Sequence, residues 1–100
     1  MGDKLSAPLR RIVLDVMKPI KGPSIIDVAK NIASINGVEG VNITVEEMDV
    51  ETAGLNITVE GNDIPFEKVE DMLETLGCVI HSIDQVITGK RMVEEKSIKE

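Results

Sequence analysis

The sequence is poor in aromatic residues and in cysteine. Its 100 residues include one Phe, Phe66, and neither Trp nor Tyr. Proteins that bind single-stranded nucleic acids stack bases on aromatic side chains, so this scarcity argues against that class. The single cysteine, Cys78, excludes an intramolecular disulfide and a Cys-pair metal motif. A fold that needs no disulfide suits a reducing compartment, and we expect a cytoplasmic protein.

Basic residues are scarce in the middle of the chain. Residues 39–84 contain twelve acidic residues and one basic residue, Lys68, in a protein of net charge −7. An acidic surface repels phosphate backbones, which again argues against a nucleic-acid partner. Residues 1–38 hold six basic residues against three acidic ones. These two parts could meet head to tail in an oligomer, or the charges could serve solubility alone.

Long hydrophobic runs are also absent. No apolar stretch reaches the roughly 18 residues of a membrane span, and the N-terminus lacks the apolar core of a signal peptide. We therefore expect no membrane partner. The composition predicts a flexible leader over residues 1–8, one domain over residues 9–95 and a frayed tail over residues 96–100.

Alternation of apolar and polar residues predicts the strands. Residues 10–17 are rich in β-branched side chains and apolar on both faces, which is typical of a central strand. Residues 41–46 and 55–60 alternate strictly and predict a hairpin with an acidic link. Keeping apolar residues opposite one another pairs Val45 with either Leu55 or Ile57, and the sequence does not decide between them. A further strand is expected over residues 78–88, and a turn at Gly89 predicts a short returning strand over residues 91–95.

Two stretches show helical spacing of apolar residues. The first begins at Ser24, a good N-cap, and ends at Asn36-Gly37, where glycine suits a left-handed residue. The second follows Asp63, its expected N-cap, and ends at Gly77. The element order is therefore β-α-β-β-α-β. With right-handed crossovers this order predicts an α+β, ferredoxin-like sandwich: a four-stranded antiparallel sheet, two helices on one face, and a short C-terminal strand.

Several segments, in the same order along the chain, resemble a known family. They are residues 11–19, 37–45, 61–63, 79–84 and 89–90, and the likeness extends over roughly residues 9–95. The family consists of small archaeal proteins and is called domain of unknown function two-one-one. The resemblance implies a ferredoxin-like fold and ring-like homo-oligomers. It implies no activity and no functional residues, because the family is uncharacterised.

Two constellations could carry chemistry. Asp15 lies among apolar neighbours in the first strand, and a ferredoxin-like fold pairs that strand with the one that holds His81. An Asp–His pair could orient a general base, or it could be a structural hydrogen bond. The hairpin link carries acidic residues, with Glu47, Asp49 and Glu51 as candidate metal ligands. Carboxylate oxygens suit Ca²⁺ or Mg²⁺, and the alternative is a solvated acidic turn that blunts edge pairing.

Three hypotheses on function follow. The first is a non-enzymatic homo-oligomeric module that binds a small ligand or a divalent cation at subunit boundaries. The second is a small enzyme with Asp15 and His81 at an interface. The third is a structural scaffold whose function is the ring itself. No motif identifies a resident cofactor, and the only partner that the sequence indicates is a second copy of the chain.

Overall fold

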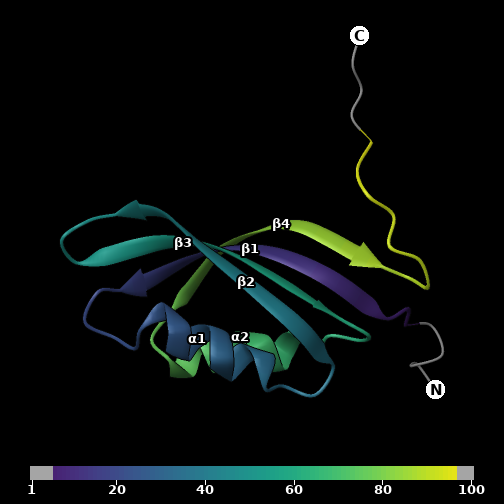
Figure 1. The fold of residues 1–100 in the computed structure, drawn as a ribbon, viewed down its shortest axis with the longest axis horizontal. Helices are drawn as coiled ribbons and strands as arrows, with labels where there is room; N and C mark the ends of the chain where they lie inside the picture. The colour runs from purple at the N-terminus through teal and green to yellow at the C-terminus, as the bar shows by residue number, and fades with distance from the viewer. Residues whose placement is uncertain (1–5, 97–100) are drawn as a thin grey trace, which may run out of the picture.

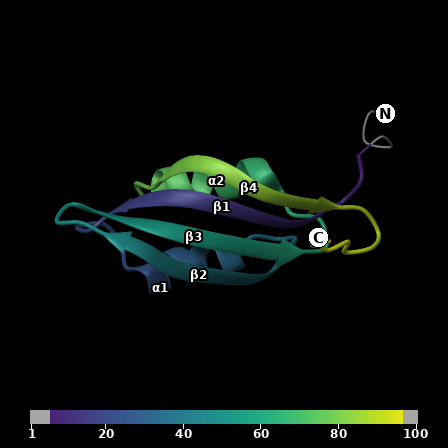
Figure 2. The same cartoon turned by 90° about the horizontal axis from the view of Figure 1, so that it is seen from above.

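The computed structural model describes residues 6–96 and confirms the predicted fold class (Figure 1). The elements are β1 (Leu9–Pro19), α1 (Ile25–Ala33), β2 (Val38–Met48), β3 (Thr52–Gly61), α2 (Phe66–Thr75) and β4 (Val79–Thr88). The strands form one antiparallel sheet in the order β2-β3-β1-β4. Both helices cover the same face of the sheet, with α1 on the side of β2 and α2 on the side of β4 (Figures 1 and 2). The opposite face, which no helix covers, is called the open face below.

An aliphatic core joins the sheet to the helices. Along β1 and β3, buried side chains alternate with partly exposed ones. The helices contribute pairs of residues four positions apart, which lie on one helix face. The core consists mainly of Ile12, Leu14, Val16, Leu55, Ile57, Val59, Val28, Ile32, Val69 and Leu73. Because β1 pairs on both sides, it is the central strand that its composition predicted.

The structure decides the register of the hairpin. Val45 lies opposite Leu55, and Ile43 lies opposite Ile57. Irregularities in the pairing leave Glu39 and Glu46 without a cross-strand partner. Each bulge adds one residue to β2, which increases the local twist of this edge strand.

The first helix begins as predicted, and the second does not. Ser24 Oγ accepts a hydrogen bond from the backbone N–H of Asp27, which confirms Ser24 as the N-cap of α1. The expectation that Asp63 caps α2 is wrong, because Pro65 is the N-cap residue there. Asp63 instead accepts a bond from the backbone N–H of Leu9. Ile64 is buried and donates its N–H to the Leu9 carbonyl, so this segment is held at the start of β1 and the helix begins after it.

The short C-terminal strand over residues 91–95 is also not formed. Gly89 does reverse the chain, with a φ of 110°, and donates its N–H to the Pro8 carbonyl. The side chain of Arg10 then binds the carbonyl oxygens of Gly89 and Lys90, which would otherwise be free for a strand partner. The chain leaves the sheet from this point on the side of the open face (Figure 1). Neither helix within residues 6–96 has the length and hydropathy needed to cross a bilayer.

One close backbone approach generates the first prediction. A Cβ atom on Gly61 would overlap the carbonyl oxygen of Gly37, whereas a Cβ on Gly40 would meet no atom within 4 Å. Gly61→Ala should therefore lower the free energy of unfolding by more than about 2 kcal/mol, since backbone atoms cannot make room cheaply. Gly40→Ala, the matched control in the neighbouring strand, should change it by less than about 0.5 kcal/mol. Urea titration followed by circular dichroism measures both, and equal effects would contradict the prediction.

Candidate functional site

The structure places Asp15 and His81 on adjacent strands but does not join them. Asp15 lies on the open face, between its cross-strand partners Asn56 in β3 and Ser82 in β4. His81 falls in a bulge of β4 and has no cross-strand partner. Within residues 6–96 neither the Asp15 carboxylate nor the His81 ring makes a hydrogen bond to a protein group. An active site built on this pair stays a prediction.

The bulges of β4 also break the alternation that a regular strand would have. Ser82 lies in register with Asp15 on the open face, whereas the pairing leaves out His81 beside it. The Ser82 hydroxyl donates a hydrogen bond of 2.7 Å to a carboxylate oxygen of Asp84, the residue at the second irregularity. This hydroxyl is therefore bound to a neighbouring carboxylate rather than to the imidazole that could activate it as a nucleophile.

The acidic residues of the hairpin divide between separate hollows. Glu46 and Glu47 share a hollow of about 370 Å³ with Asp15, on the floor made by Gly54. Asp49 lies with Glu47 in an adjoining hollow. Glu51 is elsewhere, in a hollow beside the loop that follows β1, where its carbonyl accepts the N–H of Ile20.

The hollow of Glu46 and Glu47 links the two constellations that the sequence suggested, because it brings Asp15 of the first beside Glu47 of the second. The sequence did not predict that Asp15 lies near Glu46 and Glu47. Their proximity depends on the strand order, in which β3 lies between β1 and β2. Even so, no cluster of three or more His, Cys, Asp or Glu side chains within residues 6–96 has the arrangement of a metal site. A cation held by one chain alone would thus lack ligands.

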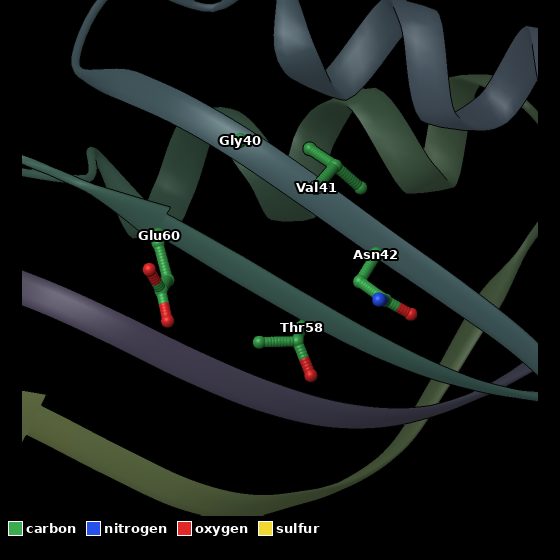
Figure 3. Close-up of a pocket in the computed structure, with 5 residues that line it drawn as sticks. All are labelled: Gly40, Val41, Asn42, Thr58 and Glu60. Carbon is green, nitrogen blue, oxygen red and sulfur yellow. The ribbon is translucent and has the colours of Figure 1, made fainter.

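A groove of about 340 Å³ lies over β2 and β3, toward the other end of the open face. Asn42, Thr58 and Glu60 line it with an amide, a hydroxyl and a carboxylate, and their side chains are shown in Figure 3. Gly40 leaves its floor without a side chain. Val41 also lines the groove, which therefore offers hydrogen-bond donors and acceptors beside a comparable share of apolar surface.

Arg11 has the strongest electrostatic contacts on this face. Its Nε donates to Glu60 at 2.7 Å, and Nη1 and Nη2 donate to the two carboxylate oxygens of Glu94 at 2.9 and 3.0 Å. The hydrogen bond to Glu94, and then that to Glu60, raises the pKa of Arg11 above its ordinary value. In return Arg11 lowers the pKa of Glu94. Sequence reasoning missed this pair, although two arginines at the start of a strand in an acidic protein were a usable signal.

Cys78 shows no sign of reactivity. Its side chain is buried beside the core, and burial raises the pKa of the thiol, while the charge of Lys18 partly opposes that effect. Lys18 itself is buried, and its ammonium donates to the carbonyl of Pro19 at 2.7 Å. Because the thiolate is the reactive form, a raised pKa makes Cys78 a poor nucleophile and a structural residue.

The comparisons with known proteins give a family but no activity. The sequence model of the family DUF211, described as "Uncharacterized ArCR", matches residues 10–100. A curated relative from Methanocaldococcus jannaschii, named "Uncharacterized protein MJ0319", is 47% identical over 87 residues. This alignment covers 87% of the present chain and 89% of the relative. The uncharacterised family that the sequence segments resembled is confirmed.

The ion pair between Arg11 and Glu94 predicts a specific titration. Glu94 should titrate below its ordinary pKa of 4.5 in the wild type and return to about 4.5 in an Arg11→Gln variant. Since the folded-state pKa is depressed, the stabilisation from this pair is present above pH 4.5 and is lost as the pH falls through the lowered value. Carbon-detected NMR of the Glu94 carboxyl carbon measures it. A Glu95→Gln control should leave the Glu94 curve unchanged, and identical curves in wild type and Arg11→Gln would contradict the pairing.

Proposed function

This chain belongs to the DUF211 family, and we propose that it is a non-enzymatic module that assembles with copies of itself through the edges of its sheet. The observation that carries the proposal is that both edge strands of the sheet are unpaired on their outer side. In the order β2-β3-β1-β4, the strands β2 and β4 each pair on one side only. Unpaired strand edges offer backbone N–H and C=O groups to another chain.

Both edges also bear apolar side chains that one chain leaves in water. On β4, Val79, Ile83 and Val86 are each at least half exposed. On β2, Val45 and Met48 are exposed. Apolar residues that gather on an unpaired strand are typical of a surface covered by a partner, since burying them is favourable by about 25 cal/mol per Å².

The charges favour contact between unlike edges. The helix beside β4, α2, carries four carboxylates against one lysine, Lys68. Pairing β4 with β4 of a second copy would bring two such helices together and would be opposed by their repulsion. Pairing β4 with β2 brings α2 beside α1, whose charges, Asp27 and Lys30, cancel. The middle of β2, residues 40–45, is uncharged.

Contact between unlike edges is head to tail, and repetition of such a contact gives a closed ring or an open filament. A ring agrees with the sequence resemblance and with the hypothesis of a scaffold. A cytoplasmic location also remains a prediction, drawn from the single cysteine.

A divalent cation at the subunit boundary is the second candidate. It is favoured by one observation, the hollow that holds Asp15, Glu46 and Glu47 at the hairpin end of β2. Because one chain supplies too few convergent ligands, a Ca²⁺ or Mg²⁺ ion there would need oxygen atoms from the neighbouring copy. The enzyme hypothesis gains nothing comparable, since Asp15 and His81 make no bond to each other within the described residues.

Assembly is tested by charging one edge. Val86→Lys places a charge on β4 at a position that is 54% exposed in the single chain, so the fold should tolerate it while the contact should not. Light scattering after size-exclusion chromatography should give the wild type a mass equal to that of several chains. The variant should form a smaller particle. Val93→Lys, at a position 64% exposed and outside the sheet, is the matched control and should assemble like the wild type. A monomeric wild-type protein at low and high salt would refute the proposal.

The cation candidate predicts a stabilisation that depends on the acidic hollow. Ca²⁺ or Mg²⁺ at one hundred times its dissociation constant should stabilise the assembly by about 2.7 kcal/mol, visible as a rise in melting temperature. Glu47→Gln should remove most of this rise, while Glu51→Gln, in a separate hollow, should keep it. The absence of any shift at millimolar metal, relative to a chelator, would end this candidate and leave the assembly proposal standing.

A further inference from the structure

Two residues of the sheet contact the guanidinium of Arg11. Arg11 lies in β1 with Glu60 of β3 on one side and Ile87 of β4 on the other. Glu60 accepts from its Nε at 2.7 Å, and Gln85 of β4 accepts from its Nη1 at 3.3 Å. These contacts hold the planar group in place and leave the remaining N–H groups of its Nη1/Nη2 edge for a further acceptor. An arginine fixed in this way is suited to receive a carboxylate with two parallel hydrogen bonds.

That edge is filled by the chain itself. Residues 89–96, called the C-terminal arm here, turn back at Gly89 and leave the sheet on the open-face side (Figure 1). Beyond Lys90 the only side chain of the arm that bonds to the rest of residues 6–96 is Glu94, through its two contacts with Arg11. The Arg11 side chain is 18% exposed and that of Glu94 is 61% exposed. The arm is therefore held by one pair whose carboxylate is open to solvent.

Two apolar side chains near the ion pair are more buried than their neighbours. Ile87 is 6% exposed, although the other apolar residues of β4 from Ile83 to Val86 are at least half exposed. It lies opposite Arg11, so the arm reaches the sheet at this position. Met92, two residues before Glu94, is half-buried, whereas its neighbours in the arm are exposed. Glu94 binds Arg11, and the burial of Ile87 and Met92 is the basis on which the proposal below assigns these two side chains to one contact.

We propose that Arg11 and Ile87 form a docking site for an extended chain segment that carries an apolar side chain two residues before a carboxylate, and that the C-terminal arm occupies this site in cis. The site exists before the arm arrives, because the Glu60 and Gln85 contacts to Arg11 belong to the sheet. The bound arm shows which chemistry the site accepts. A partner segment of the same pattern competes with the arm, and removing the arm's carboxylate favours the partner.

The surroundings of the site favour a chain segment over a small anion. The open face also carries Asp15 and Glu60, so a free anion meets repulsion, whereas a segment adds apolar contact at Ile87. Glu60 belongs both to the Arg11 cluster and to the groove with Asn42 and Thr58 (Figure 3). A segment longer than the arm would extend from Arg11 into this groove.

The test uses a fluorescein-labelled peptide with the sequence of residues 89–96 and the full-length protein. The tethered arm competes at an effective concentration of the order of millimolar, so Glu94→Gln should bind the peptide about tenfold more tightly than the wild type. Glu95→Gln is the matched control and should bind like the wild type. Fluorescence anisotropy gives the affinities, and size-exclusion chromatography run alongside shows whether assembly has changed.

Two further measurements keep the result specific. Arg11→Lys in the Glu94→Gln background keeps the charge but loses the two-pronged contact, and should abolish the gain. A peptide with Gln in place of its Glu94 should lose binding to the unchanged protein. Because the protein is not altered, a folding defect cannot cause this loss. Equal affinity of Glu94→Gln and Glu95→Gln, or binding that survives both of these changes, would overturn the docking site. The outcome does not depend on assembly through the sheet edges, which is read separately.

Discussion

The structure depends on the central position of β1. Its alternate residues Ile12, Leu14 and Val16 are buried against the helices, and it pairs with β3 on one side and β4 on the other. Because the chain has one aromatic residue, the core must be built from many contacts between aliphatic side chains. A central strand makes such contacts closely, since it is packed among neighbouring elements. The same strand places Asp15 and Arg11 on the open face, between these buried residues. Core and candidate sites are therefore two faces of one element.

Two helices cover one face of the four-stranded sheet, and no helix covers the other face. This explains why the features with functional promise lie on the open face and along the edges β2 and β4. The bulges of both edge strands fit this view, since they increase twist and limit indiscriminate pairing while leaving selected apolar residues in water. The proposed assembly uses these edges, and the proposed docking site lies on the open face.

The order of elements could be predicted because it follows from local patterns. Alternation marks the strands, helical spacing and Ser24 mark α1, and glycines at residues 37, 77 and 89 have the positive φ that their turn positions require. The errors arose where tertiary contacts overrule a local preference. Asp63 has the chemistry of an N-cap, yet the start of β1 engages it. Residues 91–95 have a strand-like pattern, yet Arg10 binds the preceding carbonyls and the segment becomes an arm.

The sequence by itself determined the fold class, the family and the aliphatic nature of the core, because periodicity and composition are local and additive properties. It also named Asp15 and the acidic hairpin as candidates, from residue chemistry alone. Only the tertiary structure decided the hairpin register, the hollow that Asp15 shares with Glu47, and the pairing of Arg11 with Glu94. Those features join residues far apart in the chain, and their geometry depends on strand order and bulges, which no local pattern encodes.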